Sequence, residues 1–253
     1  MPLVSIITPA RNAAATLGRC HEGVRNQDFP DWEHIVVDDG STDETAEIVA
    51  RLSASDARVR SVHLNAGSGS GAARNAGMAR AQGRIISFLD ADDEWLPGKL
   101  SAQINFMRQE NVSFSYGSYW LIGPGSGATR QKFSPPSKLT YRELLNGNII
   151  GCLTAAFDRQ VLGEVEMLET SRAQDWSAWL KLARRTSRIA AYPGTHAIYH
   201  WRLTPLFMVP QKLAGVWRIY RESENLELFP AASSLARHVM YRLLFKSRYI
   251  SDD

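Results

Sequence analysis

Cysteine is scarce in this chain. Its 253 residues include two cysteines, at positions 20 and 152, which lie far apart and belong to no CxxC pair. Such usage is typical of reduced thiols in a cytoplasmic protein, and we expect the chain in that compartment. A disulfide between Cys20 and Cys152 stays open as the alternative, since two cysteines are enough to form one.

Long apolar runs and a large excess of one charge are absent as well. No stretch approaches the roughly 18 apolar residues of a membrane span, so we expect no span, although the chain could still lie on a bilayer. The apolar run in MPLVSIITPARN is too short for a signal peptide and has no basic start. The net charge of +3 is small and does not indicate a nucleic-acid binder.

What the first half does contain is a regular alternation of strand-like and helix-like segments. Short β-branched apolar runs predict strands at residues 3–8, 32–37, 59–64 and 84–89. Helical segments follow them at residues 13–26, 42–55, 71–81 and 100–110, the second with Ser41 or Thr42 as N-cap. This alternation predicts an α/β fold whose mostly parallel sheet is covered by helices on both faces. Ligands of such sheets bind at the carboxyl ends of the strands.

The second half of the chain is less regular. Its patterns predict strands at residues 112–122, 149–157, 189–192 and 197–203, and helices at 139–146, 175–185, 211–224 and 233–249. Residues 123–136 are expected to form a loop or a hairpin edge. The chain length allows one large domain, or a domain with a small appendage.

Polar residues follow each predicted strand of the first half, at residues 9–12, 38–39, 65–70 and 90–93. The last group begins an acidic cluster that consists of Asp90, Asp92, Asp93 and Glu94. Carboxylates two residues apart on a turn suit a Mg²⁺ or Mn²⁺ ion that also binds phosphate oxygens. The alternative is helix capping, by acids placed before a helix that starts near Pro97. The apolar strand before the cluster and Trp95-Leu96-Pro97 after it favour the metal.

A metal bound through phosphate needs further phosphate partners. Arg74 and Asn75, in GSGSGAARNAGMARA, are candidates, because glycines let the backbone approach a ligand and an arginine can neutralise a diphosphate. The alternative is a flexible loop with a solvent-facing Arg74. The segment is not GxxxxGK[ST], so a P-loop is unsupported. PARNAA after the first strand also lacks the dinucleotide-binding fingerprint.

Four blocks of the first half resemble the family-2 glycosyltransferases of the GT-A fold: VSIITPARN, VVDDGSTDET, AARNAG and GRIISFLDADDEWLPGKL. NGNIIGCLTAAFDR and SRAQDWSAWLKLARR, further on, resemble the subgroup that builds capsular, teichuronic-acid-like, O-chain or exopolysaccharide repeats. The resemblance covers residues 3 to about 203. It implies a GT-A catalytic domain over residues 1–205, with a nucleotide-sugar-binding half (1–100) and an acceptor-binding half (101–205), followed by a helical extension (206–253).

The resemblance also implies roles for individual residues. The residues matching nucleotide-binding and donor-binding positions are Thr8, Pro9, Arg11, Asp39, Arg74, Asp90 and Asp93. Asp92 matches the direct ligand of Mn²⁺ or Mg²⁺, and Asp90 binds either the ribose or the metal. Many members have Tyr where this chain has Arg11, which leaves the contact with the base open.

Asp175 matches the general base of the family, although Gln174 replaces the usual preceding Glu. The alternative for Asp175 is an N-capping residue, because a predicted helix begins there. His200 either approaches the diphosphate or the metal, or is structural.

The activity implied by the resemblance is inverting, metal-dependent sugar transfer. The donor would be a nucleotide-diphosphate sugar, with UDP expected, and the acceptor a hydroxyl of a lipid-linked glycan in surface polysaccharide biosynthesis. Inversion follows from the resemblance alone. A nucleotidyltransferase would need a Gly-rich, basic signature after the first strand, which PARNAA does not supply. A non-catalytic scaffold of the same fold is the other alternative, and the intact Asp39, Asp90, Asp92 and Asp175 argue against it.

The C-terminal segment, residues 233–249, predicts an amphipathic helix. Its apolar side carries Leu235, Ala236, Val239, Met240, Leu243 and Leu244, and basic residues stand near the edges. Such a helix can lie on an anionic membrane surface, here the inner face of the cell membrane. The alternative is packing on the catalytic domain or on another subunit of a homo-oligomer.

Overall fold

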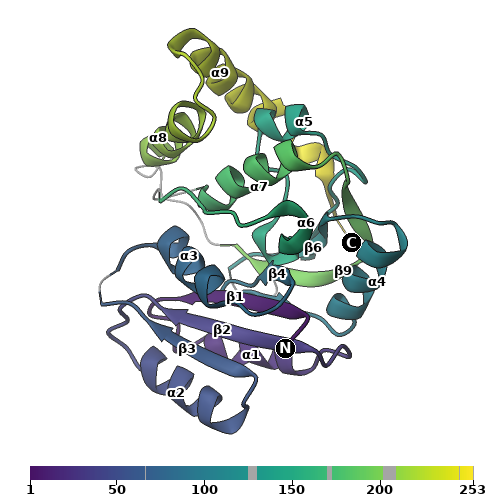
Figure 1. The fold of residues 1–253 in the computed structure, drawn as a ribbon. Coiled ribbons are helices and arrows are strands. Elements are labelled where there is room, and N and C mark those ends of the chain that lie inside the picture. Colours follow the sequence, from purple (N-terminus) through teal and green to yellow (C-terminus); the bar gives the residue numbers. More distant parts are fainter. Residues whose placement is uncertain (66, 125–129, 170–172, 202–208, 245, 253) are drawn as a thin grey trace.

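The computed structural model describes residues 1–253 except 66, 125–129, 170–172, 202–208, 245 and 253. Its first half consists of β1 (Val4–Ala10), α1 (Leu17–Arg25), β2 (Trp32–Asp38), α2 (Thr45–Ser55), β3 (Val59–His63), α3 (Ser70–Arg80) and β4 (Ile85–Phe88). The four strands pair in parallel in the order β4-β1-β2-β3. The predicted alternation of strands and helices is therefore confirmed (Figure 1).

The second half starts with β5 (Glu94–Trp95), α4 (Lys99–Gln109), β6 (Phe114–Ile122), β7 (Arg130–Phe133), α5 (Tyr141–Asn146), the 3₁₀ turn η1 (Cys152–Thr154), β8 (Ala156–Asp158) and α6 (Arg159–Leu162). It continues with α7 (Gln174–Arg185), β9 (Ile189–His200), α8 (Val209–Arg218), the π-helical η3 (Ile219–Ser223), α9 (Leu228–Leu244), the 3₁₀ turn η4 (Lys246–Tyr249) and β10 (Ile250–Asp252). Strands of both halves join one sheet, so the α/β fold is confirmed; the pairing is all parallel in the first half and mixed in the second.

Strand pairing changes character where the halves meet. The main sheet order is β10-β7-β6-β8-β4-β1-β2-β3, and β8 runs antiparallel to both β4 and β6. β9 pairs in parallel with β6 and antiparallel with the short β5, which contains Glu94, the last residue of the acidic cluster. The end of β9 is thus placed beside that cluster, far from it in sequence but close to it in space.

Several predicted elements of the second half differ from the structure. The expected strand at 149–157 is wrong for its first part, where the chain forms an irregular segment and the turn η1 before β8 begins at Ala156. The two expected strands at 189–192 and 197–203 are one strand, β9, interrupted by register shifts against β6. Residues 202 and 203 lie outside the described part. The strand β10 was not predicted, and it pairs with β7.

Helix α2 begins later than expected, at Thr45 rather than residue 42. The side chain of Asp43 accepts a hydrogen bond from the backbone N–H of Thr45, at 3.0 Å. That local turn holds the chain out of the helix until Thr45. Ser41 and Thr42 are consequently not its N-cap, which is Glu44.

Helix α3 lies unusually close to the sheet at Gly77. A Cβ atom added to Gly77 would stand 2.5 Å from Cγ2 of Ile7 on β1 and 3.2 Å from Cγ2 of Val37 on β2. Only glycine permits this approach without displacing the branched side chains. The contact fixes how deep α3 sits over the carboxyl ends of β1 and β2.

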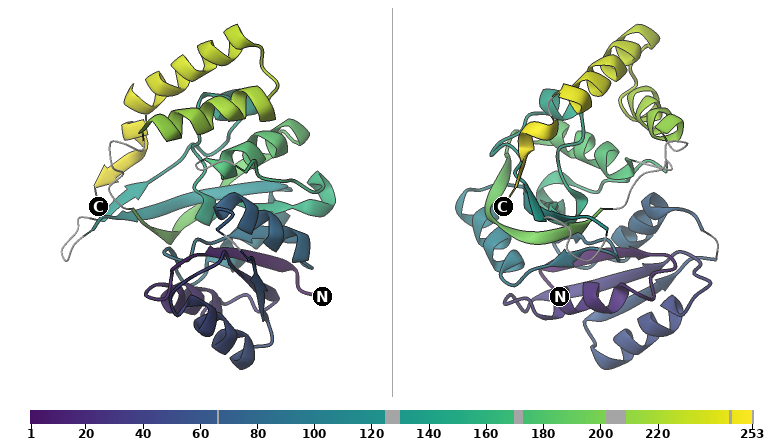
Figure 2. Two further views of the ribbon diagram at one scale, coloured as in Figure 1. Left: turned by 90° about the vertical axis from the view of Figure 1, so that its left-hand side faces the viewer. Right: turned by 180° about the vertical axis from the view of Figure 1, so that it is seen from behind.

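The C-terminal helices pack on the helices of the second half (Figure 2). The ring of His238 on α9 lies 5.0 Å from the ring of Trp176 on α7, measured between centroids. Tyr220 of η3 donates its hydroxyl hydrogen to the backbone oxygen of Leu145 at 2.8 Å. The predicted boundary at residue 205 stays a prediction. Among the described helices, none has the length and apolar character needed to cross a bilayer.

Candidate active site

A cavity of about 320 Å³ opens at the carboxyl ends of the parallel strands. Its wall includes Pro9, Arg11, Asp39, Arg74, Asp90 and Asp92 from the predicted set, together with Ala10, Asn12, Ala13, Thr16, Gly69, Ser70 and Ala91. The loops after β1, β2 and β4 and the first turns of α3 thus meet at one place. This first cavity confirms the expected convergence of polar strand ends.

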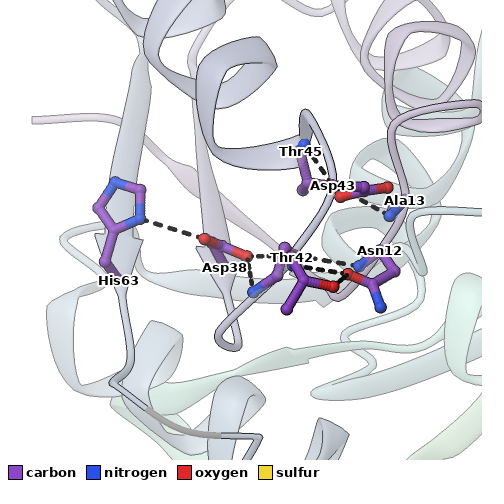
Figure 3. A network of polar contacts seen from close by, with 8 residues as sticks. Asn12, Ala13, Asp38, Thr42, Asp43, Thr45 and His63 are labelled. Carbon is purple, nitrogen blue, oxygen red and sulfur yellow. Dashed lines mark hydrogen bonds and ion pairs between the residues drawn. The ribbon is translucent and has the colours of Figure 1, made fainter.

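The loops after β1 and β2 are tied to each other beside the first cavity (Figure 3). Asn12 accepts a hydrogen bond through Oδ1 from the backbone N–H of Thr42, at 2.8 Å. The backbone N–H of Ala13 donates to the hydroxyl of Thr45 at 2.8 Å. These cross-links stabilise a fixed loop geometry before any ligand binds, which lowers the ordering cost of binding.

Asp39 links the second strand to the start of α3. It is 3% exposed, and its two carboxylate oxygens accept hydrogen bonds from the backbone N–H groups of Ser68, at 2.7 Å, and Gly69, at 2.8 Å. A carboxylate offers about four acceptor directions, so further hydrogen bonds to a ligand remain open. Asp39 can therefore hold the loop and contact a ligand together.

A second cavity of about 340 Å³ adjoins the first. Both cavities share Ser70, Arg74 and Asp90 as wall residues. The remaining wall consists of Asp93, Tyr119, Phe133, Asn148, Ile149, Ile150, Gly151, Cys152, Leu153, Ala173, Gln174, Asp175 and Tyr199. Asp175 is thereby brought to the same site as the acidic cluster, across a separation of more than eighty residues along the chain.

Arg74 stands on the shared wall and forms an ion pair with Asp90. Its side chain is 6% exposed, so the alternative of a solvent-facing arginine is wrong. Burial disfavours the cation, yet the charge of Asp90 raises the pKa of Arg74 above its ordinary value, with help from Cys152 and Asp175. Nε of Arg74 is buried and has no hydrogen-bond partner among the described residues. An anionic ligand in the first cavity would satisfy that donor.

The acids after β4 take separate positions. Asp93 is 1% exposed and accepts a hydrogen bond from the backbone N–H of His200 at 3.0 Å. Burial raises the pKa of Asp93 well above its usual range, and the charges of Asp90 and Asp92 add to the increase. This carboxyl group lines the second cavity.

His200 and Arg19 hold the acidic cluster in place. Nε2 of His200 lies 2.6 Å from Glu94 Oε1, and Nε of Arg19 lies 3.0 Å from the same oxygen. Arg19 also donates to the backbone oxygen of Asp92 at 3.1 Å. The structural alternative for His200 is thus the one the contacts support, because its ring binds Glu94.

Asp175 is the second residue of α7, whose N-cap is Ala173, so the capping alternative for Asp175 is wrong. Its Oδ2 accepts a hydrogen bond from Nδ2 of Asn148 at 2.9 Å. Burial raises the pKa of Asp175, while the charge of Arg74 and the bond from Asn148 oppose the increase. A carboxylate made more basic in this way is better suited to accept a proton from a substrate hydroxyl.

The paired carboxylates of Asp90 and Asp92 fit a hard divalent cation. Within the described part of the chain, no three His, Cys, Asp or Glu side chains converge into a ready-made metal centre. Mg²⁺ and Mn²⁺ accept such a sparse protein contribution, because they retain water and bind phosphate oxygens of the substrate. The donor set therefore suits a metal that arrives with a phosphorylated ligand.

Two sequence candidates are engaged elsewhere. Thr8 is fully buried and its hydroxyl lies 2.8 Å from Nε2 of His34, so its side chain does not line either cavity. Asn75 was expected to help bind phosphate, but both ends of its amide bind the backbone of Met167, at 2.9 and 2.8 Å. Asn75 thus fastens α3 to the second half.

Other wall residues were missed by sequence reasoning. Asn148, Tyr119 and Tyr199 come from an irregular segment and from strands, where no local pattern marks them. Ser70 and Asn12 lie within the predicted polar strand ends at residues 65–70 and 9–12, although neither was given a role of its own. The two cysteines are free thiols, so the disulfide alternative is wrong.

An α/β sheet with carboxylates and a buried arginine gathered where parallel strands end is typical of α/β proteins that bind a phosphate-bearing ligand such as a nucleotide at that edge. Within this class, the chain belongs to glycosyl transferase family 2, whose family model matches residues 5–165. It is accordingly a glycosyltransferase with the GT-A fold, as its sequence blocks indicated.

Relatives of known name agree with the subgroup. The putative teichuronic acid biosynthesis glycosyltransferase TuaG of Bacillus subtilis is 36% identical over 233 residues, which cover 91% of this chain and 92% of that protein. The UDP-Glc:alpha-D-GlcNAc-diphosphoundecaprenol beta-1,3-glucosyltransferase WfgD of Escherichia coli is 38% identical over 182 residues, 72% of this chain and 70% of that protein. Their names confirm the resemblance to enzymes of surface polysaccharides.

A solved structure agrees with the fold. The crystal structure of S. aureus TarS 1-349 in complex with UDP-GlcNAc matches with a TM-score of 0.71, covering 98% of this chain and 74% of that one. The sequences are 20% identical, so this likeness concerns the fold.

Proposed function

We propose that this glycosyltransferase moves a sugar from a UDP-sugar to a hydroxyl of a lipid-linked glycan, with inversion and with Mn²⁺ or Mg²⁺, during surface polysaccharide assembly. The observation that carries the proposal is the position of Arg74, on the wall shared by the two cavities. It pairs with Asp90 on the strand-end side, and its charge acts on Asp175 in the second cavity. A nucleotide diphosphate in the first cavity and an acceptor in the second would therefore meet at Arg74.

The reaction requires the protein to stabilise the leaving group and to accept the proton of the attacking hydroxyl. The acceptor oxygen forms a bond to the anomeric carbon, the bond from that carbon to the diphosphate oxygen breaks, and the electron pair leaves with the diphosphate. Arg74, with its unsatisfied Nε, would stabilise the charge on the leaving group. Asp175 would take the hydroxyl proton as general base. A metal held by Asp92 and Asp90 would supply Lewis-acid charge to the diphosphate.

The donor and acceptor classes rest on similarity to named proteins. WfgD is named for UDP-Glc and for a diphosphoundecaprenol-linked acceptor, and TarS was solved with UDP-GlcNAc. A mannosyltransferase from Pyrobaculum calidifontis, solved with GDP-Man and Mn²⁺, matches at a TM-score of 0.66 and 18% identity. These names support a nucleotide sugar as donor. They include both UDP and GDP, so the identity of the nucleotide base is the first point to test.

The test is a thermal-shift panel of UDP-, GDP-, CMP- and dTDP-sugars, each with Mn²⁺ and with EDTA. A UDP-sugar at about 100 times its Kd should raise Tm by about 5–10 °C when Mn²⁺ is present. Release of UDP should then be measured with the same donor, with Asp92→Asn as the metal-site variant and Glu44→Gln as an exposed control. If no donor releases its nucleotide under any condition, the non-catalytic scaffold replaces the proposed activity.

We also propose that α9 contacts the inner face of the cell membrane. Val239 and Met240, from the predicted apolar side, are 36% and 55% exposed, and Phe229 at the start of α9 is 84% exposed. The side chains of residues 242–247 lie outside the described part. Exposed apolar side chains on a helix that also carries basic residues fit an anionic lipid surface.

Flotation with phosphatidylglycerol vesicles tests the membrane contact. Replacing both Phe229 and Met240 by Ser should abolish flotation, whereas Val161→Ser, at a 62% exposed position on α6, should not. No flotation of the parent protein, together with elution as a dimer in gel filtration, would assign the exposed residues to a homo-oligomer instead.

A further inference from the structure

Asn148 occupies the wall of the second cavity, in the irregular segment between α5 and η1. Its Nδ2 donates to Oδ2 of Asp175 at 2.9 Å. This contact decides the orientation of the amide, because a carboxylate accepts hydrogen bonds and so must face the NH₂ end. The other end, Oδ1, is buried and has no partner among the described residues.

A buried carbonyl oxygen without a partner is costly and rare. The surrounding structure keeps Asn148 in place nonetheless. Ile149 and Ile150, which follow it, are 5% and 2% exposed. Gly147, which precedes it, packs against α9 so closely that an added Cβ atom would stand 2.9 Å from Cδ1 of Tyr241.

Helix α7 is joined to α5, the helix that directly precedes this segment. The indole N–H of Trp176 donates to the backbone oxygen of Leu144 at 2.8 Å, and Trp176 directly follows Asp175. The Asn148 amide and the Asp175 carboxylate therefore belong to one rigid unit, built from the end of α5 and the start of α7. A rigid amide with one end on a candidate base and the other end unsatisfied is arranged for a ligand.

We propose that Asn148 is a positioning residue: its Nδ2 orients Asp175 toward the attacking hydroxyl, and its Oδ1 accepts a hydrogen bond from the ligand that carries this hydroxyl. The inference rests on the proposed role of Asp175 as general base. Water attacking a donor sugar would use the same two contacts, so donor hydrolysis suffices as the assay.

The experiment compares Asn148→Ala and Asn148→Asp by the pH dependence of UDP release from UDP-glucose with Mn²⁺. In both variants Asp175 loses the donor that favours its ionised form, and Asn148→Asp adds a like charge beside it. The acid limb of the kcat profile should therefore move to higher pH, further for Asn148→Asp than for Asn148→Ala. At high pH, kcat of Asn148→Ala should stay about tenfold low because Oδ1 is missing. Asn148→Asp keeps an acceptor oxygen and should recover there.

Other groups that act electrostatically on Asp175 remain in every variant, so the order of the shifts is specific to Asn148. They are Arg74, Asp90, Tyr119, Cys152 and Tyr199. Asn146→Ala, at the end of α5 and on neither cavity wall, is the matched control and should behave as the parent protein.

Three results separate failure of this inference from failure of the proposed function. Unchanged acid limbs in both variants, with Asp175→Asn inactive, would overturn the positioning role while leaving the base in place. A parent-like plateau for Asn148→Ala would overturn the Oδ1 contact. Full activity of Asp175→Asn would show that Asp175 is not the general base, whatever the Asn148 variants show.

Discussion

The two halves of the sheet build the two cavities in different ways. In residues 1–100, each parallel strand delivers its polar residues directly to the first cavity, and local cross-links hold the loops. In residues 101–200, the second cavity is assembled from an irregular segment, a helix start and the end of β9. The first half is a general platform for an anionic ligand, while the second is built by tertiary packing and can vary without loss of the platform. Binding and chemistry should therefore be separable by mutation.

The largest difference between the effect on turnover and the effect on UDP affinity is expected for Asp175→Asn. Removing a general base lowers turnover by roughly 10³-fold, whereas the proposed UDP site, the first cavity, is left intact and UDP should keep its affinity. Steady-state UDP release and calorimetric titration with UDP and Mn²⁺ measure the two quantities. The exposed Asp31→Asn serves as control. A parallel loss of UDP affinity would show that the halves do not work separately.

Substitution of Arg74 should impair both UDP binding and turnover, because Arg74 lines both cavities. Arg74→Met leaves Asp90 without its cation, and we expect UDP to bind about 10²-fold more weakly, with turnover reduced as well. Arg74→Lys keeps the charge but loses the fork of donors, so its loss should be smaller. Titration with UDP and measurement of kcat on both variants provide the test. Unaltered UDP affinity in Arg74→Met would contradict the shared role.

The first half should also be more sensitive to acid. Burial lowers the pKa of His34 from 6.5 to about 3, and the neighbouring His21 adds to the decrease. Below about pH 6.5 His34 binds a proton in the unfolded chain but stays neutral in the folded chain. The free energy of unfolding therefore falls as the pH falls from about 6.5 toward 3. From pH 7 to pH 5 the loss should be about 2 kcal/mol, measurable by urea unfolding. His34→Gln should remove this slope, and the exposed His63→Gln should retain it.

The smallest effect tests how the C-terminal helices support the second half. Tyr220 donates to the backbone oxygen of Leu145 and lies 3.2 Å from that of Ser234. Tyr220→Phe should lower the free energy of unfolding by about 1 kcal/mol and leave UDP affinity unchanged. Arg218→Ala, which breaks an exposed pair with Glu222 and an exposed hydrogen bond of 3.3 Å to the backbone oxygen of Glu169, should cost about 0.5 kcal/mol or less. Equal losses in the two variants would mean that the buried contact adds nothing.

The contrast between the halves also explains what the sequence could predict. Asp39, Asp90 and Asp92 follow apolar strands, so the parallel topology alone brings them together. Arg74 lies in α3 and joins them through the packing of that helix on the sheet. Asp175 was placed by resemblance, since nothing local distinguishes a base from an acid in the first turn of a helix. Asn148 has no such signal, because its partner is a long-range contact. The expected strand over 149–157 failed for a similar reason: buried isoleucines suit a strand, but packing against α9 imposes an irregular path.

Gly77 has a consequence for reading mutational data on this enzyme. It lies one helical turn beyond Arg74, on the face that touches Ile7 and Val37. A side chain there would push α3 away from the sheet and move the guanidinium of Arg74 away from the acidic cluster. A packing defect in the hydrophobic interior would therefore be measured as a loss of substrate affinity. In a saturation screen Gly77 would be scored as a binding residue, although no ligand need ever touch it.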